Sequence, residues 1–340
     1  MNISNLHSCP LCGVSGEFIY QGLKDPVFGA PGCWNLRKCK GSDCGVIWID
    51  PRPAPDDLEK AYSTYYTHHY SQSSISGYCG YLYKWLLQGY LANRFGYDSE
   101  QTSRFQKWLS SLIRFHPGFR EDWDFKVMYL PASAIGRLLE VGCGSGDLIA
   151  FMKQKGWNVT GVDTDPVAVQ KATSRGLPVL CGTLEDSHFS SNDMDAIVLS
   201  HVIEHVHNPA ATVLECYRIL KPGGRLILAT PNHESWGHSR YREKWRGLEP
   251  PRHLFVFNRI SLFRLLHQAG FRKIDLRSSI RGAGWMMIAS RSIQNKGDYA
   301  MGRHEFFPVR LWARYMQMLE WAIVQFHPFT GEELLVIAEK

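Results

Sequence analysis

One stretch of the chain decides its fold, Leu138-Leu139-Glu140-Val141-Gly142-Cys143-Gly144-Ser145-Gly146-Asp147. Its apolar start and the helix-forming run over residues 148–155 predict a buried strand that turns sharply into a helix. Glycine at every second position lets the backbone take positive φ and approach a ligand closely. The first N–H groups of the helix are donors without an intrahelical partner. We therefore predict a nucleotide-binding turn.

The spacing of these glycines excludes a dinucleotide-binding turn, which requires Gly-x-Gly-x-x-Gly. In the register that starts at Gly142 the last position is Asp147, and in the register that starts at Gly144 it is Ile149. Residues 140–146 instead read Glu-x-Gly-x-Gly-x-Gly. This pattern resembles motif I of the class I S-adenosylmethionine-dependent methyltransferases.

Strands and helices alternate regularly after residue 134, which predicts a parallel sheet covered by helices on both faces. The predicted strands are residues 138–141, 158–163, 178–181, 194–200, 225–230, 271–277 and 333–339. The second strand ends at Asp163, about twenty residues beyond the glycines, where a carboxylate can bind vicinal ribose hydroxyls. The turn Lys221-Pro222-Gly223-Gly224 before the fifth strand is a second signature of the resembled family.

The resemblance implies an α/β fold with a Rossmann-like sheet of seven strands, helices on both faces, and S-adenosyl-L-methionine as the cofactor. It also implies that the loop at residues 182–186 covers the adenine, with Leu184 in apolar contact and an acid accepting from the amino group, for which we favour Glu185 over Asp186. The cofactor-binding residues that it implies are Glu140, Gly142, Gly144, Gly146, Asp163, Thr164, Leu184, Glu185 and Ser200.

Two cysteine pairs near the N-terminus predict a zinc ribbon. Cys9 and Cys12, and after 26 residues Cys39 and Cys44, form tight knuckles that each end in glycine. Four thiolates close a tetrahedral Zn²⁺ site without an open position, so the zinc would be structural. A unit this small would depend on its metal to fold. Cys33 is near enough to compete as a ligand, and four free thiols are the alternative.

A proline-rich linker at residues 51–55 separates this unit from the rest of the chain. We predict three parts, which are a zinc ribbon at residues 1–52, a helical linker or lid segment at 53–133, and a methyltransferase domain at 134–340 with a helical insertion at 281–331.

Aromatic residues are frequent in the helical segment. Helical patterns at residues 78–95 and 105–115 carry apolar faces, which fit a core, a partner interface or a peripheral membrane contact. Residues 65–70, rich in tyrosine and histidine, are either a lid whose side chains reach the substrate or an amphipathic surface segment.

The histidine-rich segment after the fourth strand contains the first candidate base. Side chains just past the carboxyl end of a strand face the ligand crevice, and a neutral imidazole at His205 could take a proton as the methyl group arrives. The alternative is that Glu204 and His205 only cap the next helix. His201, Glu204 and His205 also resemble the metal triad of some quinone-biosynthesis O-methyltransferases, although His201 stands where those have an acid.

His253 is the second candidate base. It lies in Glu249-Pro250-Pro251-Arg252-His253, where two prolines fix the path of the chain. The segment resembles one in sugar and small-molecule methyltransferases, in which a histidine near this place faces the acceptor. A buried histidine bonded to the backbone is the alternative.

Composition and charge limit which partners, compartment and cysteine chemistry we expect. The net charge of +6 is scattered rather than clustered, which makes nucleic acid an unlikely partner. The N-terminus lacks the pattern of a signal peptide, and no run of 18 apolar residues occurs, so we expect a cytoplasmic protein. Nine cysteines in 340 residues are too few for a disulfide scaffold.

The sequence therefore predicts S-adenosylmethionine-dependent methylation of a small or sugar-like acceptor on oxygen or carbon. The order of zinc ribbon, helical segment and sheet resembles bacterial methyltransferases of surface-polysaccharide and natural-product pathways. A ribosomal RNA methyltransferase, which also joins a zinc knuckle to this sheet, and a non-catalytic cofactor-binding module are the alternatives. The acceptor, the methylated atom and the oligomeric state stay open.

Overall fold

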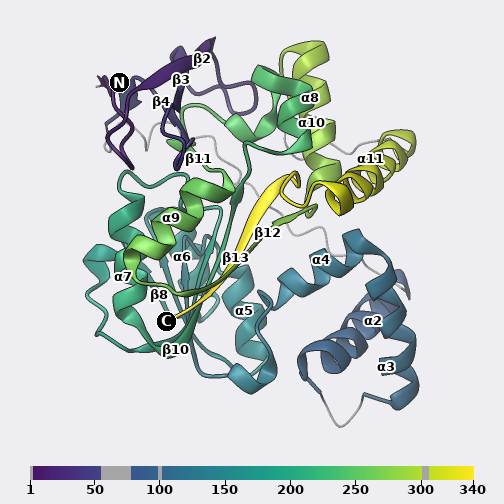
Figure 1. Ribbon diagram of the computed structural model, residues 1–340. Coiled ribbons are helices and arrows are strands. Elements are labelled where there is room, and N and C mark those ends of the chain that lie inside the picture. The colour runs from purple at the N-terminus through teal and green to yellow at the C-terminus, as the bar shows by residue number, and fades with distance from the viewer. Residues whose placement is uncertain (1–2, 55–77, 99–101, 301–305) are drawn as a thin grey trace.

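The computed structural model describes residues 3–54, 78–98, 102–300 and 306–340 (Figure 1). The predicted lid at residues 65–70 lies outside these ranges. Among the helices that the structure describes, none is long and apolar enough to cross a membrane.

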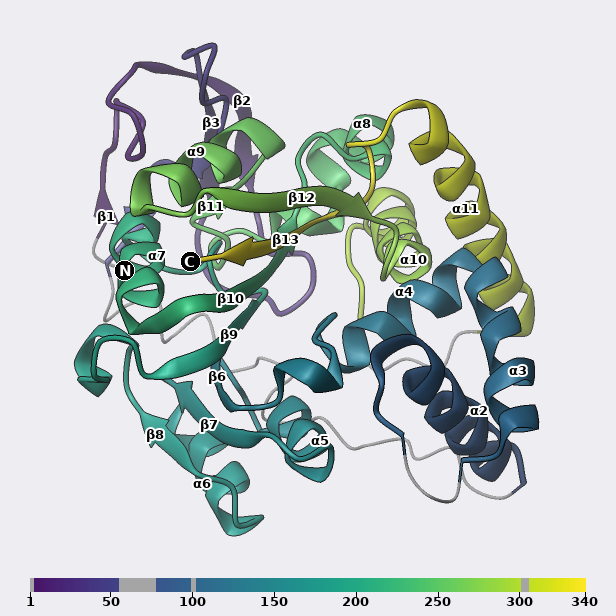
Figure 2. The ribbon, with the colours of Figure 1, turned by 60° about the horizontal axis from the view of Figure 1, so that its bottom comes forward.

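A seven-stranded sheet forms the centre of the molecule and confirms the predicted fold class (Figures 1 and 2). Its strands, in spatial order, are β12 (Lys273–Ser279), β13 (Glu333–Glu339), β10 (Leu220–Pro231), β9 (Met194–Ser200), β6 (Arg137–Val141), β7 (Asn158–Asp163) and β8 (Val179–Cys181). β13 runs antiparallel to both of its neighbours. The predicted parallel sheet is therefore mostly parallel, and β13 is the exception because the chain re-enters the sheet at the end where β12 leaves it.

Helices cover both faces of the sheet, and successive strand residues pack on opposite sides. Leu139 belongs to a core with α7 (Pro209–Ile219) and α9 (Arg259–Ala269). Leu138 belongs to a second core with α5 (Asp147–Gln154) and α6 (Pro166–Ser174). Helix starts follow local sequence, since the caps of α6 and α7, Asp165 and Asn208, each precede a proline in the first turn.

The N-terminal unit is a second, smaller sheet in the order β11-β4-β3-β2. Its strands are β2 (Gly16–Leu23), β3 (Trp34–Cys39), β4 (Ile47–Ile49) and β11 (Phe255–Val256), while β1 (Ile3–Ser4) pairs with β5 (Arg52–Pro53). β11 comes from the far part of the chain, and Phe255 lies opposite Trp48. The boundary at residue 52 stays a prediction, and this sheet extends across it.

The remaining helices lie along one side of the molecule (Figures 1 and 2). They are α2 (Tyr78–Phe95), α3 (Arg104–Ser111), α4 (Pro117–Lys126), α8 (Trp236–Tyr241), α10 (Ala283–Lys296) and α11 (Phe307–Phe326). A short 3-10 turn at Leu112–Phe115 joins α3 to α4. The predicted helix at 105–115 is therefore two elements, and His116, whose side chain accepts from the backbone N–H of Phe119, caps α4.

Candidate functional site

The site lies at the carboxyl edge of the main sheet, between β6 and β9. β7 and β8 lie on one side of β6 in the sheet, and β9 and β10 lie on the other side, so the strand order reverses at β6. Ligands bind in the crevice at such a reversal of strand order. The glycine turn after β6, Asp163 at the end of β7 and Ser200 at the end of β9 all meet there.

The glycine turn has the geometry of a ligand cradle. Gly142, Gly144 and Gly146 take φ values of 69°, 52° and 80°, a region that favours glycine. A Cβ on Gly142 would lie 2.4 Å from the side chain of Val202, whereas a Cβ on Gly144 would meet no protein atom within 4 Å. The turn is therefore tightly packed at Gly142 and open at Gly144.

Two carboxyl groups flank the cradle. Asp163 accepts hydrogen bonds from the backbone N–H groups of Gly144, at 2.7 Å, and Asp165, at 2.8 Å. Each of its oxygens keeps a lone pair that a ribose hydroxyl could use. Glu140 is buried, and its Oε2 atom has no hydrogen-bond partner among the described residues. Burial, with Asp163 nearby, holds the pKa of Glu140 well above its usual range. A cationic ligand would satisfy this group.

The other predicted cofactor-binding residues differ in how exposed they are. Leu184 is buried in the core beside α7, and Ser200 is half-buried. Thr164 is exposed. Glu185 accepts a hydrogen bond of 2.8 Å from the hydroxyl of Thr212 on α7. Glu185 is thus held toward the protein, and its contact with a cofactor stays a prediction.

His205 and His253 are brought together although 48 positions separate them in the sequence. Their rings lie 4.8 Å apart in an edge-to-face arrangement. Nδ1–H of His205 donates to the carbonyl of Arg252 at 2.9 Å, and Nδ1–H of His253 donates to the carbonyl of Gly247 at 2.7 Å. In the neutral rings the lone pair is therefore on Nε2. Burial lowers the pKa of His253 to about 4, so this ring is neutral at pH 7.

Glu204 is a buried anion beside both rings. Its Oε2 atom accepts from the hydroxyl of Thr230 at 2.9 Å. Burial alone would raise the pKa of Glu204, but His201, His205 and His253 together lower it to about 2. One ligand atom each of Glu204, His205 and His253 lies within 4.8 Å of the others, which makes this trio a group that could hold a metal ion. The predicted trio differs, since its third member is His201.

His201 follows β9 directly and lies between two carboxylates. Its Nε2 atom is 3.0 Å from Oε1 of Glu333, and its Nδ1 atom is 3.3 Å from Oε1 of Glu204. Burial would lower the pKa of His201, but Glu333 and Glu204 raise it to about 9. Sequence reasoning missed Glu333, because the β13 strand that it opens returns from more than 100 positions away.

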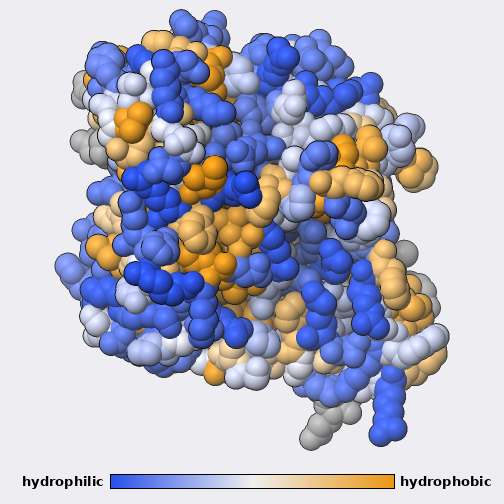
Figure 3. All heavy atoms as spheres, viewed as in Figure 1, coloured by the Kyte–Doolittle hydropathy of each residue, from blue (hydrophilic) through white to orange (hydrophobic). Residues whose placement is uncertain are grey.

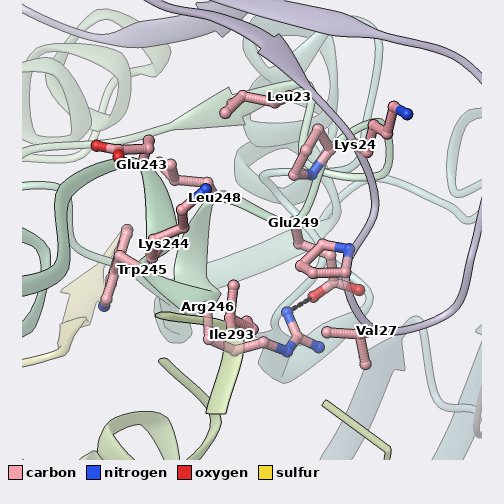
Figure 4. Close-up of a pocket in the computed structure, with 12 residues that line it drawn as sticks. Leu23, Lys24, Val27, Glu243, Lys244, Trp245, Arg246, Leu248, Glu249 and Ile293 are labelled. Carbon is pink, nitrogen blue, oxygen red and sulfur yellow. Dashed lines mark hydrogen bonds and ion pairs between the residues drawn. The ribbon is translucent and has the colours of Figure 1, made fainter. Parts of the chain in front are cut away.

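A buried ion cluster fixes the loop that bears His253. Arg252 has no exposed side-chain surface, and it donates to Asp25 at 2.9 Å and to Glu249 at 2.8 Å. Glu249 also pairs with Arg246, and Val27 of the N-terminal unit lies beside this pair (Figure 4). Asp25 belongs to the loop between β2 and β3. No sequence signal pointed to it, since its partner is 227 positions away.

The N-terminal unit holds the His205 segment as well. The guanidinium of Arg52 donates to the carbonyl of His207 at 3.1 Å, and the ring of His207 bonds the carbonyl of Pro53 at 3.1 Å. The N-terminal unit therefore contacts both segments that carry the candidate bases.

The four predicted zinc ligands converge. The sulfur atoms of Cys9 and Cys44 are 3.8 Å apart, those of Cys12 and Cys39 are 3.3 Å apart, and all four lie within 4.8 Å of one another. The Cys44 thiol, helped by backbone N–H groups, holds the pKa of Cys9 well below its usual range. Cys33 is exposed and outside the group. The donor set fits a tetrahedral metal ion.

Replacing His201 with glutamine should flatten the pH dependence of stability at alkaline pH. The pKa of His201 is about 9 in the native state and about 6.5 in an unfolded chain. The native state therefore binds more protons, and its stabilisation is present below about pH 6.5 and lost as pH rises through 9. The side chain is 37% exposed, so the loss is modest.

Urea midpoints at about pH 6 and about pH 9 measure this effect. A His267→Gln variant is the control, because His267 is exposed on α9 and stacks only on Phe263. The control should lose stability with pH as the wild type does. An unchanged loss in His201→Gln would contradict the pairing with Glu333.

Comparisons with known proteins identify the family of this chain. A family model described as a methyltransferase domain matches residues 91–276. A protein of Mycolicibacterium smegmatis named "probable S-adenosylmethionine-dependent methyltransferase" is 32% identical over 187 residues, which cover 52% of this chain and 70% of the relative. A ubiquinone biosynthesis O-methyltransferase of Xanthomonas oryzae pv. oryzae is 37% identical over 103 residues, 28% of this chain and 43% of the relative.

The chain thus spans less than half the length of the Xanthomonas relative. A solved structure of a methyltransferase from Archaeoglobus fulgidus aligns with 69% of this chain and 94% of its own, at 17% identity and a TM-score of 0.42. The family model covers more than half of the chain and includes the glycine turn, Asp163 and both candidate bases. The chain belongs to the methyltransferase-domain family, as a class I S-adenosylmethionine-dependent methyltransferase.

Proposed function

We propose that this enzyme methylates a hydroxyl or an activated carbon of a small or sugar-like acceptor, with His205 as the base. The observation that carries this proposal is the hydrogen bond from Nδ1–H of His205 to the carbonyl of Arg252. That bond fixes the tautomer, so the lone pair of the neutral ring is on Nε2. The ring follows the end of β9 by five residues, and a position past the carboxyl end of a strand supports a contact with the ligand.

The glycine turn, Glu140 and Asp163 would hold the cofactor. The carboxyl groups of Glu140 and Asp163 fit its positive charge and its ribose hydroxyls. When bound, S-adenosylmethionine supplies an electrophilic methyl group, and catalysis then depends on aligning an acceptor with it.

Removing a proton from the acceptor leaves His205 as an imidazolium. Glu204 stabilises that cation, because it is a buried carboxylate whose pKa is lowered to about 2. His253 stays neutral beside it, since burial lowers its pKa to about 4. We assign His253 a positioning role at this site, since it is buried and its Nε2 atom lies 3.6 Å from Oε2 of Glu249.

The named relatives support a small-molecule acceptor, since one is a ubiquinone biosynthesis O-methyltransferase. Ribosomal RNA methylation and non-catalytic cofactor binding are the competing functions. The proposal also includes one structural zinc held by Cys9, Cys12, Cys39 and Cys44. Their convergence within 4.8 Å supports it.

The His205→Gln variant should lose methyl transfer while it keeps cofactor binding. Loss of a general base lowers the rate by about 10²-fold to 10⁴-fold. Tritium transfer from S-adenosylmethionine into the small-molecule and RNA fractions of a cell extract measures activity, and calorimetry measures cofactor affinity. His267→Gln is the control and should be as active as the wild type. Label only in RNA would favour the RNA function, and cofactor binding without transfer into any fraction would favour the non-catalytic one.

Replacing Gly144 with alanine should abolish cofactor binding without an unusual loss of stability. Gly144 and Gly176 have φ values of 52° and 72°, and a Cβ on either would meet no protein atom within 4 Å. Each alanine variant should therefore lose about 1–2 kcal/mol from backbone strain. Only at Gly144 would the methyl group enter the cradle. Calorimetry and thermal unfolding compare the two, and normal cofactor affinity in Gly144→Ala would refute this placement.

Replacing Cys12 with serine should remove the zinc. Metal analysis should find one zinc per chain in the wild type and in Cys33→Ser, because Cys33 is exposed and outside the group. Cys12→Ser should contain much less zinc and unfold at a lower temperature, since a structural metal contributes to folding. Equal zinc in both variants, or a folded wild type without metal, would refute the ribbon.

A further inference from the structure

Two helical segments carry apolar stripes that the rest of the described chain leaves uncovered. Along α3 and the 3-10 turn after it, Phe105, Trp108, Leu112 and Phe115 are exposed at intervals of three and four residues. Along α11, Phe307, Leu311 and Tyr315 are exposed at intervals of four. Such spacing places the members of each stripe on one side of the helix.

The helices α3 and α11 lie on the same side of the molecule, with α4 between them (Figures 1 and 2). The guanidinium of Arg314 on α11 lies 5.0 Å over the ring of Phe119 on α4, and Phe115 precedes that ring by four residues. Figure 3 shows apolar side chains at this edge, over α11 and below it. We name this surface the aromatic face, made up of Phe105, Trp108, Phe115, Phe307, Leu311 and Tyr315.

Only positive charge accompanies the aromatic face on these segments. Residues 104–115 contain no acid, and the only acid of α11, Glu320, is fully buried. Four exposed arginines lie among the apolar residues, which are Arg104, Arg114, Arg310 and Arg314. A partner must therefore take apolar side chains and guanidinium groups together. The headgroup layer of an anionic bilayer does so, since aromatic rings insert among the lipids while arginines stay at the phosphates.

A groove opens beside the aromatic face. It has a volume of about 540 Å³ and lies between α10 and α11, with Trp285, Ile288, Phe307 and Leu311 as apolar walls. Gly282 also lines it, and the neighbouring Arg281 reaches to 3.1 Å from the ring of His201 after β9. The groove thus lies between the aromatic face and the edge of the sheet that carries the methyl-transfer site.

We propose that the aromatic face docks on the surface of an anionic lipid bilayer, and that the groove admits the apolar chain of an acceptor held in that bilayer. The docking part of this proposal follows from the aromatic face alone. The part that concerns the acceptor chain in the groove rests on the proposed methyl transfer. Docked in this way, α3 and α11 lie in the plane of the surface, and none of the described helices crosses it.

Vesicle cosedimentation of the full chain tests docking without any acceptor. The protein should bind vesicles of equal phosphatidylcholine and phosphatidylglycerol at least about tenfold more tightly than phosphatidylcholine alone, and high salt should weaken the binding. Trp108→Glu and Leu311→Glu should each weaken binding about tenfold or more, because a charge replaces an inserting side chain. The control is Leu214→Glu on α7, where the side chain is 56% exposed and outside the aromatic face.

Thermal unfolding of each variant verifies folding, which surface substitutions should preserve. Failure to bind the mixed vesicles, or an equal loss in Leu214→Glu, would overturn docking. A wild-type dimer that Trp108→Glu converts to a monomer in light scattering would also overturn it, since the aromatic face would then be an interface between two copies.

The tritium assay tests whether the acceptor has an apolar chain that enters the groove. Label should appear in the chloroform-soluble fraction, and Ile288→Trp, which fills the groove, should lower it while vesicle binding persists. Label confined to water-soluble products would overturn the apolar acceptor and leave methyl transfer intact. Absence of label from every fraction would overturn the proposed function itself, while the vesicle result would stand.

Discussion

The buried guanidinium of Arg252 is the interaction on which the geometry of the site depends. An ion without exposed surface costs several kcal/mol to bury unless it is paired, and here Asp25 and Glu249 both accept from it. Asp25 belongs to the N-terminal unit, so the pairing locks that unit to the His253 loop. The carbonyl of the same arginine fixes the ring of His205. One residue therefore couples the fold of the first 54 residues to the orientation of the proposed base.

This coupling has a second route through the backbone. β4 begins three residues after Cys44 and pairs with β11, and β11 begins two residues after His253. A shift of the backbone at the cysteine group would therefore displace the His253 loop through the pairing of β4 with β11. Hydrogen bonds from the backbone N–H groups of Leu254 and Phe255 to the carbonyl of Glu204 continue the connection to the segment after β9. The N-terminal unit is consequently part of the frame that holds the site.

The sequence predicted those structural features that depend on residues close to one another along the chain. The apolar strands and the glycine turn are local features, and the structure contains them. The partners that sequence reasoning missed at the site lie far away along the chain. Asp25 meets Arg252 across 227 positions and His201 meets Glu333 across 132, so no spacing rule could pair them. The reversed direction of β13 likewise follows from where the chain re-enters the sheet.

The parts that bind the cofactor and the parts that would choose the acceptor come from different regions. The family match at residues 91–276 includes the glycine turn and both histidines. The frame around the histidines includes Asp25 and Glu333, and the groove is lined by α10 and α11, all outside that match. Proteins that bind the same cofactor need the same glycine turn, whereas proteins that act on different acceptors need different residues lining the acceptor site. If methyl transfer proceeds as proposed, these regions outside the family match would determine the choice of acceptor, and a change of acceptor would alter them before it altered the sheet.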